Sequence, residues 1–554
     1  MRRLSILVRR SSKRWTAGAA AIAAVLAAPA GAQNAAPAAA PKAAPKLIVA
    51  ISVDQLSSDL FAQYRRHATG GFARLLGGVV FPSAYQSHAA TETCPGHSTI
   101  LTGMRPDKTG IIANSWIDQT ARPAKPEVYC AEDPSVPAAP GDEYTPSVKH
   151  LRVATLGEMM KRRDPATRVV SVAGKDRAAL MMGGRQIDEV WWLKGRGFAS
   201  LPGRTPPPVV ARANMAVAEL IGRAQPALSL PRWCAANDLP VQVGTGTMGQ
   251  GRHARAAGDT RLFRASPAAD AAVLSLAAGL VQDMKLGQGA STDLLAIGAS
   301  ATDYVGHAFG TEGAEMCIQI AELDQALGSF FEMLDGWKID YEVVLTSDHG
   351  AHDATERHQQ RAMPMAARVA PGLSIKAIGA EIGAKLKLTG PVLLGSEGDV
   401  YIDKARPAAA RARVMTEALA RFRAMPQIAA ALPRTALIAT RVPTTPPETW
   451  TLVERARASF DPERSGDILL LLQPRVTPIP VPAPGYVATH GSPWDYDRRV
   501  PLIFWRAGRA GFEQPLSVET VDIAPTLAAT IGLPVTGLDG RCLDLEVGPA
   551  STCP

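Results

Sequence analysis

Residues 47–54 read LIVAISVD, a run of seven residues that is apolar apart from Ser52 and ends at the carboxylate of Asp54. Such a continuous run is typical of a parallel strand that is covered on both faces. Similar runs recur at 169–173, 294–297, 343–345 and 500–505, and a helical pattern spans 313–334. The alternation of strands and helices predicts an α/β fold, an α/β/α sandwich with a mostly parallel central sheet.

The composition is that of a globular protein. The chain has 554 residues, of which 46% are hydrophobic and 20% are charged, so it can bury a core and is not a disordered chain. Two segments, at about 185–290 and 355–485, are rich in Pro, Gly and Arg and show few clean periods. We interpret them as insertions that cover one rim of the sheet, within one domain over residues 47–554.

Residues 1–32 have the pattern of a cleaved secretory signal peptide. Six basic residues precede the apolar run 17–28, and Ala30-Gly31-Ala32 matches an A-x-A cleavage site. The run has twelve residues, too few for the alternative, an N-terminal membrane anchor. Residues 33–46 are rich in Ala and Pro, which predicts a flexible or extended linker. We therefore expect an exported protein, periplasmic or extracellular.

Removal of the signal changes the charge balance. The formal net charge falls from +8 to about +2, which gives no argument for nucleic-acid binding. After residue 46 no run is long and apolar enough to predict a membrane span in the mature chain.

The six cysteines contain no CxxC pair, which argues against a zinc ribbon. In an exported protein an even number of cysteines favours disulfides. Six cysteines allow many pairings, so the connectivity stays open. Proximity along the chain favours Cys94–Cys130 and Cys542–Cys553, which leaves Cys234–Cys317.

Polar side chains follow four of the predicted strands, at the strand ends where open α/β sheets bind their ligands. They are Asp54 after the first strand, Lys175 and Arg177 after the second, Asp303 and His307 after the third, and Asp348 and His349 after the fourth. Asp303 and His307 are four residues apart, which places them on one face of a helical turn. Three strand ends thus supply metal-type ligands, and one supplies two cations.

A further imidazole, His490, lies in the turn-rich segment ATHGSPWDYDRRVPLIFW at 488–505. With it, the strand ends and turns carry three carboxylates and three imidazoles. Mixed His/Asp sites without thiolates suit Zn²⁺ and related divalent ions. Six ligands are enough for two ions that share one site.

A candidate nucleophile lies in the segment TETCPGHSTILTG at 91–103, where a strand-like stretch leads into a turn and then a helix. Thr93 is at this turn, where the N–H groups of a helix N-terminus favour a developing anion. A threonine hydroxyl is a weak nucleophile unless it is deprotonated, which a metal ion promotes. Cys94 is better interpreted as a disulfide partner, and we expect His97 to turn away from the site and pack the helix.

Eight stretches, in this order, resemble the alkaline phosphatase superfamily. The resemblance is strongest to the bacterial secreted alkaline phosphatases that use threonine as nucleophile, which are near the nucleotide pyrophosphatase/phosphodiesterases. The stretches are SVDQ (52–55), TCPGH (93–97), TGIIAN (109–114), GKDR (174–177), TDYVGH (302–307), SDHG (347–350), HGSPWDYDRRVPL (490–502) and VDIAPTLAATIGLP (521–534).

The resemblance implies hydrolysis of phosphate monoesters at alkaline pH through a phosphothreonine intermediate. It implies two zinc ions, one held by Asp303, His307 and His490 and the other by Asp54, Asp348, His349 and the oxygen of Thr93. Asn114, Lys175 and Arg177 then bind the phosphoryl oxygens. His352 matches no ligand position. An additional structural divalent ion stays open, although the sequence contains no EF-hand loop to hold it.

Three other functions compete with this interpretation. A sulfatase would carry Cys or Ser where the register places Thr93, and arginine where the chain has His97. A phosphodiesterase or nucleotide pyrophosphatase shares the threonine and the ligands, but a diester presents one charged oxygen fewer, and Lys175 and Arg177 favour the monoester. A non-catalytic exported zinc protein would lack Thr93 or one of the ligands, and all are present.

Overall fold

A ten-stranded sheet forms the centre of the structure, a computed structural model that describes residues 43–120, 126–136, 144–396, 398–548 and 550–554. Its strand order is β19 (Phe512–Glu513), β2 (Val79–Tyr85), β18 (Arg499–Arg506), β11 (Tyr341–Thr346), β1 (Leu47–Val53), β10 (Asp293–Ala299), β5 (Val169–Ala173), β6 (Glu189–Lys194) and β7 (Gly197–Ala199), with β20 (Val518–Glu519) beside β2. The predicted signal peptide and residues 33–42 of the predicted linker lie outside the described residues.

The middle of this sheet is parallel. Strands β11, β1, β10, β5 and β6 all run in one direction. The predicted strand at 500–505 is part of β18, which runs antiparallel between β11 and β2. The prediction of a mostly parallel central sheet is thus confirmed.

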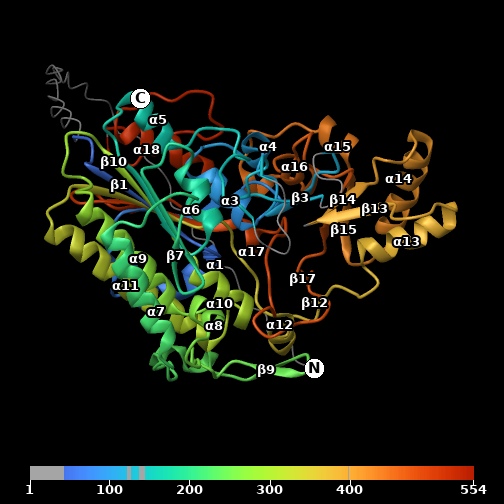
Figure 1. The fold of residues 1–554 in the computed structure, drawn as a ribbon, viewed down its shortest axis with the longest axis horizontal. Coiled ribbons are helices and arrows are strands. Elements are labelled where there is room, and N and C mark those ends of the chain that lie inside the picture. The colour runs from blue at the N-terminus through green and yellow to red at the C-terminus, as the bar shows by residue number, and fades with distance from the viewer. Residues whose placement is uncertain (1–42, 121–125, 137–143, 397, 549) are drawn as a thin grey trace, which may run out of the picture. The chain divides into compact units, whose positions relative to one another are not determined.

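Both faces of the sheet are buried, as the continuous apolar run of β1 predicts. Leu47, Val49 and Ile51 point into one hydrophobic core, and Ile48 and Ala50 point into the other. Helices cover the first face: α1 (Ser58–Tyr64), α2 (Gly71–Leu75), α7 (Pro208–Gly222), α9 (Pro267–Asp283), α10 (Ala301–Phe309) and α11 (Ala314–Gly336). The second face is covered by α3 (Thr93–Ile100), α5 (Leu156–Arg163), α6 (Asp176–Gly183) and α18 (Ile523–Thr530). These two layers complete the α/β/α sandwich (Figure 1).

A second, smaller sheet lies within the segment 355–485. Its order is β13 (Leu393–Ser396), β14 (Asp399–Ile402), β16 (Ile468–Leu472) and β15 (Ile428–Pro433), and α13 (Ile375–Leu386) and α14 (Ala408–Arg423) share a separate apolar core with it. Figure 1 shows this group in yellow and orange, apart from the main sheet. The segment 185–290 differs, because it supplies β6, β7 and α9 to the main sheet and its helical layer.

The structure joins the six cysteines as chain proximity favours. Disulfides link Cys94 to Cys130, Cys234 to Cys317 and Cys542 to Cys553. No helix within the described residues combines the length and the apolar character needed to cross a membrane.

Candidate active site at the strand ends

The polar residues that follow the parallel strands meet at one edge of the main sheet. Asp54 comes directly after β1, and Asp348 and His349 come just after β11. Asp303 is in the first turn of α10, which follows β10. Because the carboxyl ends of parallel strands share an edge, residues that are far apart in the sequence become neighbours.

Three histidines direct the same ring nitrogen toward Asp303. The Nε2 atoms of His490, His307 and His349 lie 3.2, 3.4 and 3.9 Å from its Oδ1. Their Nδ1 atoms instead bond backbone carbonyls, of Thr91, Ala488 and Gly350 respectively, at 2.8, 2.8 and 2.9 Å.

These carbonyl contacts decide the tautomer of each ring. A carbonyl only accepts, so each Nδ1 carries the proton and each Nε2 of a neutral ring offers a lone pair. Lone pairs that face a carboxylate oxygen at such distances repel one another unless a cation lies among them. Histidines that ligate metals are oriented by their other nitrogen in this way, so this donor set fits a metal ion.

The pKa values of His490 and His307 favour the neutral ring, whereas Asp348 raises the pKa of His349 against the effect of burial. Burial lowers the pKa of His490 to about 4 and also lowers that of His307, which keeps both rings neutral near neutral pH. Burial alone would raise the pKa of Asp303, but Lys175 and the adjacent histidines hold it well below its usual range. Asp303 is therefore a carboxylate surrounded by the neutral imidazoles of His490 and His307, the ring of His349 and one ammonium group.

A second cluster of possible ligands comprises Asp54, Asp348 and His97. The Oδ1 atom of Asp348 accepts the N–H groups of Gln55 and His349 at 3.1 and 2.9 Å. Its Oδ2 atom and both oxygens of Asp54 are buried and accept no hydrogen bond in the described part of the chain, although the ammonium of Lys175 and the rings of His97 and His349 lie within 3.3 Å of them. Buried carboxylate oxygens left in this state fit a bound cation.

His97 lies inside this cluster, so the prediction that it turns away from the site is wrong. Its Nε2 atom is 3.3 Å from Asp54, and its Nδ1 atom is 3.2 Å from Asp348 and 2.9 Å from the carbonyl oxygen of Thr93. Residues four apart on a helix share one face, so Thr93 and His97 both face the strand ends. Gly96 permits this close approach, because a Cβ atom there would lie 2.0 Å from the carbonyl oxygen of Asp348.

Thr93 is the first residue of α3 and is buried. Two cations converge on its hydroxyl oxygen, with Nζ of Lys175 at 3.4 Å and Nη2 of Arg177 at 3.5 Å. Lys175 also contacts Asp303 at 2.6 Å and Asp54 at 3.1 Å, so it connects the two carboxylate clusters. Burial would lower the pKa of Lys175, but these two carboxylates raise it, and the ammonium stays charged at alkaline pH.

Arg177 is held by a tyrosine that the sequence analysis did not identify. Its Nη1 atom donates to the hydroxyl of Tyr129 at 3.4 Å, and this hydroxyl donates to Asp176 at 2.9 Å. The hydroxyl of Tyr144 donates to the other oxygen of Asp176. Burial raises the pKa of Tyr129, so its hydroxyl remains a donor at alkaline pH.

The disulfide Cys94–Cys130 links the two sides of this arrangement. Cys94 follows Thr93, and Cys130 follows Tyr129. Asn114 lies between the two half-cystines, because its Oδ1 atom accepts the N–H of Cys94 and its backbone oxygen accepts the N–H of Cys130, both at 2.9 Å. The structure thus brings Asn114 next to Thr93.

Gln55 is a second residue that the sequence analysis missed. It adopts a left-handed conformation with φ of 68°, and its Nε2 atom donates to Asp303 at 3.2 Å. Gly306 makes room for it, because a Cβ atom there would lie 1.5 Å from Oε1 of Gln55. In the sequence, a glycine inside a predicted helix, one residue before His307, indicates that another group packs closely against the helix at this point.

His352 stays apart from the Asp303 cluster. Its ring stacks on that of His358 at 5.7 Å between centroids and meets Tyr496 at 5.0 Å. Nothing in this arrangement makes it a ligand.

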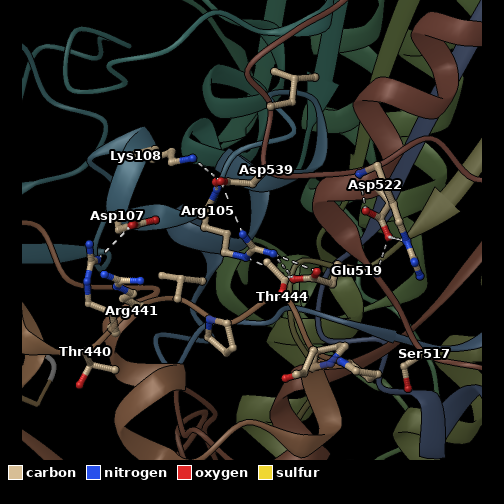
Figure 2. A pocket seen from close by; sticks show the side chains of 18 of the residues that line it. Arg105, Asp107, Lys108, Thr440, Arg441, Thr444, Ser517, Glu519, Asp522 and Asp539 are labelled. Carbon is tan, nitrogen blue, oxygen red and sulfur yellow. Dashed lines mark hydrogen bonds and ion pairs between the residues drawn. The ribbon is translucent and has the colours of Figure 1, made fainter.

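A cavity of about 770 Å³ lies away from these residues, around Arg105 and Asp539 (Figure 2). Its charged side chains largely neutralise one another. Arg105 pairs with Glu519 at 2.7 Å, Lys108 pairs with Asp539, and the dashed lines in Figure 2 mark these contacts. None of the site residues expected from the sequence lines it.

Sequence comparisons place the chain among known hydrolases. The sequence profile of the family described as type I phosphodiesterase / nucleotide pyrophosphatase matches residues 48–493. The chain is similar to alkaline phosphatase PhoK of Sphingomonas sp, with 56% identity over 515 residues that cover 92% of this chain and 92% of the relative. It is also similar to alkaline phosphatase PhoD of Zymomonas mobilis, with 47% identity over 517 residues that cover 92% of this chain and 89% of the relative.

Comparison with solved structures addresses the fold. The chain resembles the crystal structure of alkaline phosphatase PafA with a TM-score of 0.79 and 23% identity, over 93% of this chain and 100% of that chain. This likeness confirms the α/β fold with its large central sheet.

Proposed function

The chain belongs to the type I phosphodiesterase / nucleotide pyrophosphatase family. Within this family we propose that it is an alkaline phosphatase that hydrolyses phosphate monoesters. Two relatives at 56% and 47% identity are named alkaline phosphatases, which supports the proposal. The chain aligns over most of its length with both of them.

One observation favours a monoester over a diester as the substrate. Lys175 and Arg177 both lie within 3.5 Å of the hydroxyl oxygen of Thr93. A phosphoryl group bound at that oxygen would present its non-bridging oxygens to two cations. A monoester dianion has one more charged oxygen than a diester, so it gains more from two fixed positive charges. The family description keeps the phosphodiesterase as the second candidate.

In this proposal Thr93 is the nucleophile. Its Oγ1 atom forms a bond to phosphorus while the bond to the ester oxygen breaks and the alcohol leaves. Water then hydrolyses the phosphothreonine, which releases phosphate and restores Thr93. Lys175, Arg177 and Asn114 bind the phosphoryl oxygens, and Asn114 also holds the first turn of α3 through its Oδ1 atom.

We further propose that the site takes two zinc ions. Asp303, His307 and His490 would hold one, and Asp54, Asp348, His349 and the Thr93 oxygen would hold the other. The clusters of buried imidazoles and carboxylates within the described residues fit such ions. When bound, two divalent ions stabilise the attacking and the leaving oxygens of an in-line displacement.

Export is the remaining part of the proposal. The predicted signal peptide at 1–32 would direct the chain to the periplasm or the outside of the cell. The three disulfides support an oxidising compartment.

Hydrolysis of p-nitrophenyl phosphate and bis-p-nitrophenyl phosphate tests the function. We expect a large preference for the monoester, loss of turnover after chelation, and recovery when zinc is restored. Thr93→Ala should abolish turnover, whereas Thr93→Ser keeps a hydroxyl and should retain part of it. A preference for the diester would assign the phosphodiesterase instead, and full activity in Thr93→Ala would refute the nucleophile.

Metal content can be measured separately from activity. Elemental analysis of the purified protein should find two zinc ions per chain, and Asp303→Ala should lose one of them. Equal zinc content in the wild type and in Asp303→Ala would contradict the proposed ligands.

A further inference from the structure

A second cavity, of about 460 Å³, begins at the cations beside Thr93. Lys175 and Arg177 line it, and both also reach the hydroxyl oxygen of Thr93. Tyr304, which follows Asp303 in α10, lines it as well. The cavity therefore adjoins the proposed phosphoryl position and is bordered on one side by α10 at Tyr304.

Two further cations line this cavity, and neither is paired with a carboxylate of the described chain. Lys194 is at the end of β6, and Arg264 is at the end of α8 (Thr260–Arg264). Within the described residues neither side chain forms an ion pair or a hydrogen bond, and each lies over a tyrosine ring. Lys194 is 5.9 Å from the ring centroid of Tyr144, and Arg264 is 5.1 Å from that of Tyr304.

The aromatic rings orient these cations without neutralising them. In the cavity around Arg105, by contrast, arginine and lysine pair with carboxylates. Carboxylates line the present cavity too, among them Asp176, which accepts hydrogen bonds from Tyr129 and Tyr144 and keeps its charge, but within the described residues no ion pair joins a carboxylate to Lys194 or Arg264. The charges of Lys194 and Arg264 are thus available to a ligand.

We propose that this cavity is a subsite for a second anionic group of the substrate, so that the enzyme prefers phosphate monoesters that also carry a distal phosphoryl or carboxylate group. The inference rests on the proposed phosphatase function. The substrate phosphoryl lies at Thr93 between Lys175 and Arg177. The distal anion lies farther along the cavity, where Arg264 and Lys194 donate charge-assisted hydrogen bonds to it.

Matched substrates test the subsite on the zinc-loaded enzyme. Propyl phosphate and propane-1,3-diyl bisphosphate differ only in the distal phosphoryl group. A substrate with two equivalent phosphoryl groups has a roughly twofold lower KM for statistical reasons alone. We expect KM for the bisphosphate to be lower than for propyl phosphate by roughly a further fivefold or more. Glycerol 3-phosphate and 3-phosphoglycerate repeat the comparison with a carboxylate as the distal group.

Variants assign the effect to the cavity. Arg264→Ala and Lys194→Ala should each raise KM for the bisphosphate severalfold. Each should thereby narrow the gap in KM between propyl phosphate and the bisphosphate. Arg261→Ala removes an exposed cation of the same helix α8 that does not line this cavity, so it should leave the gap unchanged. High salt should narrow the gap in the wild type, because it screens partly exposed charges.

The outcomes separate this inference from the proposed function. If KM for the two propyl substrates differs by no more than about twofold in the wild type, or if Arg264→Ala and Lys194→Ala leave that difference intact, the subsite is refuted and the phosphatase stands. If the wild type hydrolyses neither substrate, the proposed function fails. A gap seen with the bisphosphate but not with 3-phosphoglycerate would restrict the subsite to phosphoryl groups.

Discussion

The hydroxyl of Tyr129 offers a sharp test of how Arg177 is positioned. It accepts from Nη1 of Arg177 at 3.4 Å and donates to Asp176 at 2.9 Å. Tyr129→Phe removes both bonds and keeps the ring. Tyr144→Phe is the matched control, because its hydroxyl also donates to Asp176 but has no hydrogen bond to Arg177 within the described residues.

The expected magnitude depends on the strength of the lost contact. A hydrogen bond to a charged group contributes about 1.5–3 kcal/mol, and the long distance of this one places it at or below the lower end. A loss of about 1.4 kcal/mol corresponds to roughly tenfold in kcat/KM. We therefore expect Tyr129→Phe to lower kcat/KM for p-nitrophenyl phosphate roughly tenfold and Tyr144→Phe to lower it at most two- to threefold.

The diester provides the internal reference. Arg177 contributes less to a substrate with one charged oxygen fewer, so Tyr129→Phe should lower kcat/KM less for bis-p-nitrophenyl phosphate than for the monoester. Thermal unfolding of both variants checks that the fold is retained. Equal losses in the two variants, or equal losses on the two substrates, would refute a positioning role for Tyr129.

Three further predictions concern stability and metal binding. Burial raises the pKa of Asp399 to about 7, so its stabilising contribution is complete below the unfolded pKa of about 4 and is lost as the pH rises to 7. In thermal unfolding, the free energy of unfolding of Asp399→Asn should therefore rise relative to that of the wild type over this pH interval, by up to about 4 kcal/mol. Above pH 7 the difference should stay constant. Replacing both Cys94 and Cys130 by Ala should cost about 3 kcal/mol in denaturant unfolding and lower monoesterase activity. Gly306→Ala should displace Gln55 from Asp303 and weaken zinc binding roughly tenfold in competition with a chelator.

Each of these has a contrary result. A constant stability difference between Asp399→Asn and the wild type from pH 4 to 9 would show that the buried carboxyl does not titrate as stated. Unchanged stability without the Cys94–Cys130 link would remove its structural role. Gly336→Ala, at a glycine with open space around it, is the control for Gly306→Ala, and equal zinc affinities in the two would contradict the role of Gln55.

Much of the fold could be predicted because buried parallel strands have a strong local signature. The run at 47–53 and the run at 169–173 coincide with β1 and β5, and both are buried along their whole length. The segment 185–290 was harder to interpret. Its strand β6 is part of the main sheet, but the Gly-Arg-Gly turn after it and the Pro-rich stretch beyond that turn hide the period of its helices.

The residues of the candidate site divide in the same way. Asp54, Lys175 and Asp348 could be predicted because each lies just after an apolar run, and a strand end is a local feature. Tyr129 and Gln55 have no such pattern. Tyr129 is close to Arg177 because a disulfide and the hydrogen bonds of Asn114 bring its loop to α3.

The order of strands and helices, the cluster of ligands at the strand ends and the family resemblance can all be inferred from the residues alone, because each depends on residue types and their local spacing. Three contacts required the folded chain: His97 faces Asp54 and Asp348, Tyr129 holds Arg177, and Lys194 and Arg264 line a cavity beside them. These contacts join residues that are distant in the chain, and their geometry depends on how closely helices and loops pack against the sheet. Spacing along the sequence carries no record of that packing.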